Sequence, residues 1–282
     1  MRRPDSACAW YVSKYVSPPG QASAGGRGYL IMREIAKRGI KSVVLTSDSN
    51  QLAQVPQLEA PFEVQEVDGL TLVWVKTLKY SIAKSLRRIL SWLHFEWRLL
   101  FLPLDKLPRP DTIIVSSLSL LTVLNGFRWR RRYGCRLILE IRDIWPLTIV
   151  EEGGFSRYNP LVAALGMIET LGYRSADAIV GTMPNLAAHV EHVLGHKRDT
   201  YCIPMGVDPG SLEPAIALPE GYVQTYLSSG QFVVAHVGSI GIANALDTFF
   251  ECAQAMQTNT RIRFLLVGEG DLRTHYEQHY SH

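Results

Sequence analysis

Glycines at the end of a predicted strand and an adjacent arginine are the first residues in the sequence that could bind an anion. Gly25 and Gly26 lie in the loop after the strand expected at 8–12, and Arg27 follows them, just before the helix expected at 29–38. Glycine lets backbone N–H groups approach a phosphate, and a helix N-terminus presents unpaired N–H groups to it. The loop is therefore a candidate phosphate site, with Arg27 as a candidate anion or acceptor ligand. The alternative is a plain turn, since the loop has neither a GxGxxG fingerprint nor a Walker lysine.

A second candidate site follows the strand expected at 136–140, in the stretch Glu-Ile-Arg-Asp-Ile-Trp-Pro. Ligands of doubly wound sheets bind at the carboxyl ends of strands, which is where Arg142 and Asp143 fall. Arg142 could hold a phosphate or carboxylate with two hydrogen bonds, and Asp143 could accept a hydrogen bond from a sugar hydroxyl. The alternative is a surface Arg–Asp pair, with Trp145 packed in the core.

Glycine turns recur near the C-terminal end of the sequence. Gly238, Ser239 and Gly241 follow the strand expected at 232–237, and Gly268 follows the strand expected at 262–267. Such turns leave no side chain between backbone N–H groups and a phosphate. The spacing of His275, His279 and His282 is compatible with a metal site, but the polar tail supplies few other ligands. We therefore expect a solvated helix face and no metal site.

The segment from Ile82 to Leu102 has the pattern of a long amphipathic helix that is basic and rich in aromatic residues. Peripheral proteins lay such helices on anionic bilayers. The alternative is a helix that packs on its own sheet with its charges outward. The candidate membrane contacts are Lys84, Arg87, Arg88, Trp92 and Arg98.

The net charge of +3 is unevenly distributed along the 282 residues. Thirteen lysines and arginines stand against three acidic residues between Lys76 and Arg136, so this segment carries +10. A basic segment suggests an anionic ligand or surface. No stacking-aromatic or helix-turn-helix pattern accompanies it, and we expect no nucleic acid partner.

The composition is that of an ordinary globular α/β chain, with 47% hydrophobic and 20% charged residues. The sequence has no run of about 18 apolar residues that would span a membrane, and its start does not resemble a signal peptide. Four scattered cysteines lack metal or disulfide spacing, which favours reduced thiols and a cytoplasmic location.

Strand and helix patterns alternate along the chain, which is typical of a parallel sheet with crossover helices. Residues 1–204 are predicted to form a complete Rossmann-like domain, and 205–231 a Pro- and Gly-rich linker. Residues 232–282 contain one β-α-β unit and a short polar tail, so we expect an incomplete C-terminal domain. The other expected strands are 43–46, a hairpin at 64–75, 112–116, 178–180 and 201–203; the expected helices are 29–38, 82–102, 119–133, 160–174, 185–194 and 244–256.

Seven motifs, taken in order, resemble those of family 4 glycosyltransferases, which have the GT-B fold of two Rossmann-like domains. They are PPG…SAGGRG, VVLTSDSN, EIRDIWP, IETLGYRSADAIVGTMPN, IPMGVD, VAHVGSIGIANALDTFFECA and FLLVGEGD. The sequence is most similar to the bacterial branch that builds cell-surface polysaccharides, including lipopolysaccharide, and that contains N-acetyl-fucosaminyltransferases.

The resemblance implies roles for the candidate residues. It places Gly25 and Gly26 near the donor diphosphate, and Asp143 in a loop that binds sugar or acceptor and could take part in catalysis. It also places Gly238, Ser239, Gly241 and Gly268 under the diphosphate. No cofactor is implied beyond the nucleotide-diphosphate sugar, which is the donor substrate.

The sequence departs from the family pattern in three ways. No cation accompanies Ser239 in the first donor-side loop, and Met205 stands where the hinge motif Asn-Gly-Val-Asp has asparagine. The paired-glutamate motif that binds the donor is expected beyond His282, so the chain is interpreted as C-terminally truncated.

The leading interpretation is a retaining glycosyltransferase (a hexosyltransferase) that acts on a polyprenyl-linked or other saccharide acceptor in surface polysaccharide synthesis. We expect it in the cytoplasm, peripheral on the inner face of the plasma membrane. One alternative is an inactive fragment or acceptor-binding module that lacks the donor site. Another is a GT-B-like nucleotide-sugar epimerase. Whether this chain transfers sugar by itself is left open.

Overall fold

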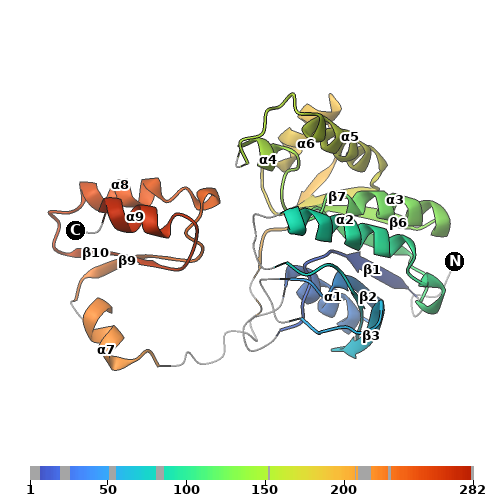
Figure 1. The fold of residues 1–282 in the computed structure, drawn as a ribbon, viewed down its shortest axis with the longest axis horizontal. Helices are drawn as coiled ribbons and strands as arrows, with labels where there is room; N and C mark the ends of the chain where they lie inside the picture. The colour runs from blue at the N-terminus through green and yellow to red at the C-terminus, as the bar shows by residue number, and fades with distance from the viewer. Residues whose placement is uncertain are drawn as a thin grey trace. The chain divides into compact units, whose positions relative to one another are not determined.

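A computed structural model of the chain describes residues 7–19, 26–50, 55–80, 86–151, 153–206, 208, 217–227 and 230–280 (Figure 1). The chain divides into two units, Met1–Ser211 and Leu212–His282, and each is considered by itself. The two candidate residues Gly25 and Lys84 lie outside the described residues.

The first unit is built on an eight-stranded sheet with the order β3-β4-β2-β1-β5-β6-β7-β8. Every neighbouring pair is parallel except β3 and β4, which form an antiparallel hairpin at one edge. A parallel sheet brings the carboxyl ends of its strands to one edge, where ligands bind. The strands are β1 (Cys8–Val12), β2 (Lys41–Ser47), β3 (Phe62–Val67), β4 (Leu70–Val75), β5 (Thr112–Ser116), β6 (Arg136–Ile141), β7 (Ala178–Gly181) and β8 (Thr200–Cys202).

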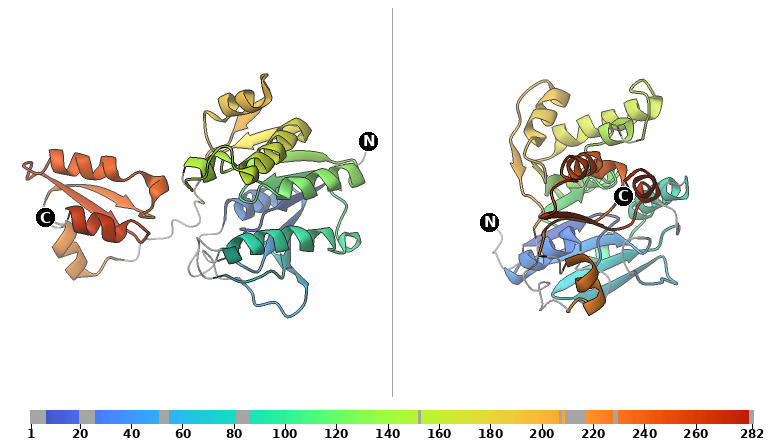
Figure 2. Two further views of the ribbon diagram at one scale, coloured as in Figure 1. Left: turned by 45° about the horizontal axis from the view of Figure 1, so that its top comes forward. Right: turned by 90° about the vertical axis from the view of Figure 1, so that its left-hand side faces the viewer.

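Helices cover both faces of this sheet, as the views in Figure 2 show. Tyr29 and Met32 of α1 pack on one face, whereas Phe95 of α2 and Trp129 of α3 belong to the core of the other. Burial on both faces explains why β1 is apolar throughout its length. The helices are α1 (Arg27–Lys37), α2 (Leu86–Leu100), α3 (Thr122–Tyr133), α4 (Leu147–Glu151), α5 (Pro160–Ser175) and α6 (Leu186–Leu194).

The start of α1 is fixed by a buried ion pair. The Arg27 guanidinium donates to Glu140 Oε1 at 2.9 Å and to the backbone oxygens of Ile203 and Pro204 at 2.8 and 2.7 Å. The Tyr11 hydroxyl donates to the other Glu140 oxygen. Position 28 must be glycine because a Cβ there would lie 2.3 Å from the Tyr11 ring. These contacts join α1 to β1, β6 and the end of β8.

The hairpin at the sheet edge turns at Asp68 and Gly69, which have φ angles of 52° and 76°. Two consecutive positive φ angles are the signature of a type I′ turn, which suits a two-residue hairpin. The Tyr29 hydroxyl of α1 donates to Asp68 Oδ2 at 2.5 Å and ties the turn to the helix layer.

The described part of the second unit contains one parallel β-α-β element and further helical segments. β9 (Phe232–Val237) pairs with β10 (Ile262–Val267), and α8 (Asp247–Ala255) connects them. The helix α9 (Arg273–Tyr280) follows, and α7 (Glu220–Tyr222) continues into a π-helical turn over Val223–Leu227. Its described core consists of Ile240, Leu246 and Tyr276.

The predicted strands and most of the predicted helices are confirmed, with ends that shift by a few residues. The short helix α4 was not predicted, and residues 220–227 are helical within the predicted linker; α9 corresponds to the helix face expected at His275 and His279. The α9 sequence RTHYEQHY is polar, but Tyr276 and Tyr280 stack on Phe250 at ring distances of 4.4 and 4.5 Å. Tertiary packing therefore stabilises a helix that its own composition does not indicate.

Candidate functional site

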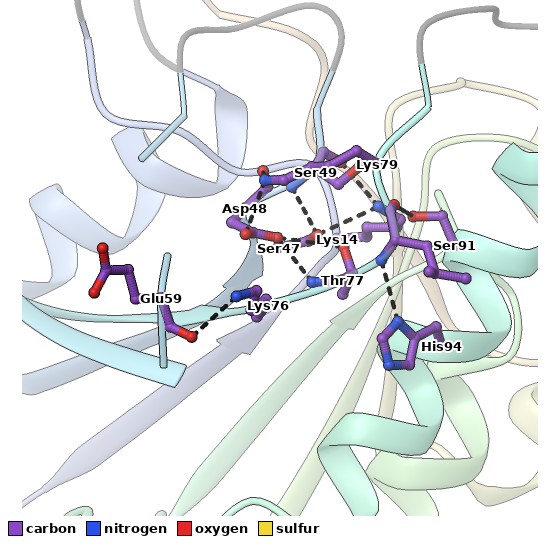
Figure 3. Close-up of polar contacts among 11 residues, drawn as sticks. Lys14, Ser47, Asp48, Ser49, Glu59, Lys76, Thr77, Lys79, Ser91 and His94 are labelled. Atoms are coloured by element: carbon purple, nitrogen blue, oxygen red, sulfur yellow. Dashed lines mark hydrogen bonds and ion pairs between the residues drawn. The ribbon is translucent and has the colours of Figure 1, made fainter. Parts of the chain in front are cut away.

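Polar side chains from several strands meet at the carboxyl edge of the sheet in the first unit. Lys14 follows β1, Asp48 follows β2 and Thr77 follows β4 (Figure 3). Further along the edge, Ser117 follows β5 and Asp143 follows β6. We call these residues and their direct contacts the edge site.

Lys14 lies at the centre of the edge site, and its side chain is fully buried. Its ammonium group donates to the Ser49 backbone oxygen at 2.8 Å and to Ser47 Oγ at 3.3 Å. Burial lowers the pKa of Lys14 to about 7; Asp48 opposes this shift, and the nearby Lys79 adds to it. The lysine is therefore poised to change charge near neutral pH.

Asp48 is also fully buried and holds the loop that follows β4. Its Oδ1 accepts from the Thr77 backbone N–H at 2.8 Å, and its Oδ2 pairs with Lys79 Nζ at 2.8 Å. The Lys79 ammonium also donates to the backbone oxygen of Asp48. These contacts bring the chain after β4 close to Lys14.

Aromatic rings form one wall of the edge site. The Tyr15 hydroxyl accepts from Trp92 Nε1 at 2.5 Å and from the Tyr80 hydroxyl at 3.0 Å. Lys14 Nζ lies 5.2 Å from the Tyr15 ring centroid and 5.4 Å from that of Tyr80. Trp92 meets Trp145 edge to face at 5.6 Å. A wall of this kind can pack against the C–H face of a sugar or a lipid chain.

Ser117 orients the loop that carries Arg142 and Asp143. Its hydroxyl accepts from the backbone N–H of Arg142 at 2.9 Å and donates to the backbone oxygen of Asp143 at 3.1 Å. Burial raises the pKa of Asp143, and Arg142 and Arg88 oppose that shift. A partly desolvated carboxylate of this kind can accept a hydrogen bond from a substrate hydroxyl.

Glu96 connects the α2 side of the edge site to α3. The buried carboxylate accepts from Thr122 Oγ1 at 2.5 Å, Asn125 Nδ2 at 2.8 Å and Ser119 Oγ at 3.2 Å. Burial raises the pKa of Glu96 to about 7, against the effect of these hydrogen bonds and of Lys14. The three donors precede α3 or lie in its first turn, so Glu96 fixes α2 against α3.

Two polar groups at the N-terminus of α1 contact other parts of the protein. The Gly26 N–H donates to the Ser17 backbone oxygen at 3.1 Å, and Arg27 is 9% exposed with its guanidinium on Glu140. The anion that Arg27 contacts is therefore a carboxylate of the protein itself.

In the second unit, the loops after β9 and β10 pack backbone against backbone. The Gly238 N–H donates to the Val267 oxygen and the Ile240 N–H to the Glu269 oxygen, both at 2.9 Å. A Cβ at Gly268 would lie 1.7 Å from the Gly238 oxygen. This close approach by itself requires glycine at 268. Ser239 is exposed and Gly241 is half-buried beside it.

The helix α2 presents its candidate membrane contacts on two different sides. Arg87 is exposed, whereas Trp92 is hydrogen-bonded inside the edge site and Arg88 lies over the Trp92 ring with Cζ 4.9 Å from its centroid. Arg98 is half-buried and donates to His94 Nε2 at 3.1 Å. The alternative is confirmed in that α2 packs on its own sheet through Phe95 and Leu99. Its solvent side, however, is mainly apolar and not charged: Ile89, Leu90, Leu93, Trp97, Leu100 and the following Phe101 are exposed.

Sequence reasoning missed Lys14, Asp48, Lys79 and Glu96. The signal that could have identified Lys14 and Asp48 is their place directly after two buried strands. Glu96 and Lys79 carry no comparable signal, because their burial depends on contacts between distant segments.

Within the described ranges, no helix combines the length and apolar character needed to cross a bilayer. Across the same ranges, no three His, Cys, Asp or Glu side chains are placed to hold a metal ion.

Comparison with protein families gives a match over residues 29–206 to the family described as glycosyl transferase 4-like domain. This range begins in α1 and ends just after β8, and it includes Asp48, Trp92 and Asp143. A comparison with curated proteins gives no match.

Solved structures share the fold at low sequence identity. The structure of the Anabaena protein HepE in complex with UDP and glucose aligns with a TM-score of 0.50 and 13% identity, over 97% of this chain and 63% of that one. The trehalose-6-phosphate phosphatase N-terminal domain of Candida albicans aligns with a TM-score of 0.57 and 10% identity, over 98% of this chain and 67% of that one. This chain thus spans 63% of the length of HepE.

The lowered pKa of Lys14 predicts how stability depends on pH. Between pH 7 and about 10 the unfolded chain keeps a proton that the folded chain has released, so stability rises with pH in this window. Lys14→Met removes the effect. In urea unfolding, the unfolding free energy of the wild type should rise between pH 7 and about 9.5, and that of Lys14→Met should not follow this rise. We therefore expect the variant to lose about 1–3 kcal/mol relative to the wild type over this range.

The exposed-site variant Lys41→Met is the control and should follow the wild-type profile. Parallel pH profiles for Lys14→Met and the wild type would show that Lys14 does not titrate in this window.

Proposed function

The chain belongs to the family of proteins with a glycosyl transferase 4-like domain, and on this premise we propose that it transfers a sugar from a nucleotide-diphosphate donor to a saccharide acceptor, which the edge site binds. The observation that carries the proposal is the edge site itself. Lys14 lies there beside the rings of Tyr15 and Tyr80, and the charge of Arg88, which lies over the Trp92 ring, acts on Asp143. Saccharides are bound by such combinations of carboxylates and aromatic faces.

In the proposed reaction, Asp143 orients the acceptor. Its carboxylate accepts a hydrogen bond from the acceptor hydroxyl, whose oxygen then bonds to the anomeric carbon of the donor sugar. The bond from that carbon to the diphosphate oxygen breaks, and the diphosphate leaves with the electron pair. We propose retention of configuration, in which the departing diphosphate oxygen takes the hydroxyl proton. Considered by itself, the second unit offers Ser239 and Gly241 as proposed backbone ligands for a diphosphate, in a loop that Gly238 and Gly268 shape.

The test of this proposal is acceptor-dependent release of nucleoside diphosphate from a panel of UDP-sugars and other nucleotide sugars. Asp143→Asn keeps the shape of the side chain and removes its charge, so we expect kcat to fall by about 100-fold or more. Asp105→Asn changes an exposed aspartate in the 3₁₀ helix Leu104–Lys106 and should leave the rate unchanged.

Wild-type turnover in Asp143→Asn would remove Asp143 from the reaction. Acceptor binding without any release of nucleoside diphosphate would instead identify an acceptor-binding module that transfers nothing.

We also propose that the exposed side of α2 contacts an anionic membrane surface. Trp97 is 54% exposed and Phe101 is 70% exposed, although both are large aromatic side chains. Arg87 on α2 and Arg128 on α3 flank this surface; Arg128 donates to the Leu100 backbone oxygen at 3.2 Å. Apolar side chains flanked by arginines match the inner face of a plasma membrane and a polyprenyl-linked acceptor in surface polysaccharide synthesis.

Replacing both Trp97 and Phe101 by serine should weaken binding to phosphatidylglycerol vesicles by about tenfold or more, since two aromatic side chains lose their burial in the bilayer. Vesicle co-sedimentation measures this. The control Met167→Ser alters a side chain on α5 that is 69% exposed and should not change binding. Equal retention of the double variant and the wild type would contradict a membrane role for this side of α2.

A further inference from the structure

The loop after β6 carries a cation and an anion side by side at the carboxyl edge of the sheet. Arg142 and Asp143 are consecutive, and both are half-buried. Within the described ranges, neither the guanidinium nor the carboxylate has a hydrogen bond or an ion pair, not even with the other. The loop therefore offers a ligand one fork of N–H donors and one acceptor carboxylate.

The backbone under these two side chains is held by one buried hydroxyl. Ser117 Oγ accepts from the Arg142 N–H at 2.9 Å and from the Asp143 N–H at 3.3 Å, and it donates to the Asp143 backbone oxygen at 3.1 Å. Ser117 is 1% exposed. Because both residues start from a fixed backbone, less ordering is needed when a ligand binds them.

The carboxylate at the end of the preceding strand is already engaged. One oxygen of Glu140 accepts from Arg27 at 2.9 Å, and the other accepts from the Tyr11 hydroxyl. Two arginines near the same edge thus differ in what they can bind. Arg27 is neutralised inside the protein, whereas the guanidinium of Arg142 keeps its donors for another group.

The charge of Arg142 acts on two separate elements of the edge. Burial raises the pKa of Tyr11 in β1; Glu140 adds to the rise, and Arg142 opposes it. Burial also raises the pKa of Asp143, and Arg142 again opposes the shift. The guanidinium therefore lies within electrostatic range of a group on β1 and of a group after β6. An anion held by Arg142 would lie beside the carboxylate proposed to orient the acceptor.

The neighbouring Asp143 decides which anion fits Arg142. A guanidinium binds a carboxylate or a phosphate through two parallel N–H donors. A phosphate group carries up to two negative charges near neutral pH, whereas a carboxylate carries one. Since like charges repel at close range, the carboxylate is the better neighbour for Asp143. A sugar with both a carboxylate and hydroxyls satisfies the donor fork and the acceptor together.

The same loop carries an aromatic surface and a further donor. The Trp145 ring meets that of Trp92 edge to face at 5.6 Å, and such rings can pack against the C–H face of a sugar. The Trp145 Nε1–H is shielded from solvent and has no hydrogen-bond partner in the described part of the chain. The chemistry of the loop is thus suited to a saccharide as well as to its charge.

We propose that Arg142 binds the carboxylate of an acidic acceptor sugar, a uronic acid, while Asp143 accepts a hydrogen bond from a hydroxyl of the same sugar. This inference rests on the proposed function, because it names the class of acceptor that the edge site takes. Arg142 is then the residue that selects acidic over neutral saccharides, and it takes no part in bond formation.

Binding of methyl glycosides to the full chain, followed by NMR titration without a donor, tests the proposal. The methyl glycosides of glucuronic and galacturonic acid carry the carboxylate, and those of glucose and galactose are their neutral counterparts. We expect at least one uronide to bind about tenfold or more tightly than its neutral counterpart, since a charge-assisted contact is added. Arg142→Gln should abolish this preference and leave binding of the neutral glycoside unchanged.

Two further variants serve as comparisons. Arg142→Lys keeps the charge but loses the planar fork, so its preference for the uronide should be intermediate. Arg132→Gln alters an exposed arginine in the last turn of α3 and should bind as the wild type does. Because each variant is titrated with both glycosides, a variant that fails to fold is recognised by the loss of both.

Two other ligands of the wild type identify what the site recognises. If acetate competes with the uronide at equal concentration, the site takes any small carboxylate and the proposal fails. If glucose 6-phosphate binds more tightly than both uronides, the site takes a phosphate and the proposal fails as well.

Equal affinity of the wild type for uronides and neutral glycosides, no binding of either uronide, or an unchanged preference in Arg142→Gln would also overturn it. Failure of this inference and failure of the proposed function are distinguishable. Sugar transfer to a neutral acceptor that is unaffected by Arg142→Gln would leave the function standing without the carboxylate site. Arg142-dependent binding of a uronide without any transfer would leave the carboxylate site standing without the function.

Discussion

The buried ion pair between Arg27 and Glu140 is the interaction on which the rest of the first unit depends. Glu140 lies in β6, and its two oxygens accept from Arg27 at the start of α1 and from Tyr11 in β1. The same guanidinium holds the backbone after β8. Such a pair is costly to desolvate, and loss of either partner would leave a charge uncompensated inside the protein. The ion pair thus fixes the relative positions of α1, β1, β6 and the backbone after β8 near the carboxyl edge of the sheet.

The same arrangement of strands and helices positions the side chains of the edge site. Residues 13–19 follow the strand that contains Tyr11, and the Gly26 N–H donates to the Ser17 oxygen. Lys14 is therefore buried among the loops after β2 and β4, and α2 closes the site with Trp92. The same helix turns its apolar side chains toward solvent. The helix α2 thus contributes both to the edge site and to the surface proposed for the membrane, and part of its apolar surface lies outside the core.

Much of this fold could be predicted from the sequence, because buried parallel strands are apolar throughout and glycine or proline marks their ends. The place of Asp143 after a strand could be predicted in the same way. The orientation of α2 could not be predicted, because apolar residues surround most of the helix. Its buried side is identified by Phe95 and Leu99, which belong to the core of the sheet. The burial of Lys14 and Glu96 could not be predicted either, because their partners come from distant segments.

The central claim is that the carboxyl edge of the first unit binds the acceptor, and hydrogen–deuterium exchange tests it most directly. On addition of a prenyl-diphosphate-linked saccharide, we expect slower exchange in peptides that cover 13–17, 77–80, 88–92 and 142–145. Slower exchange confined to the unit Leu212–His282, or no change in the first unit at saturating acceptor, would contradict the account.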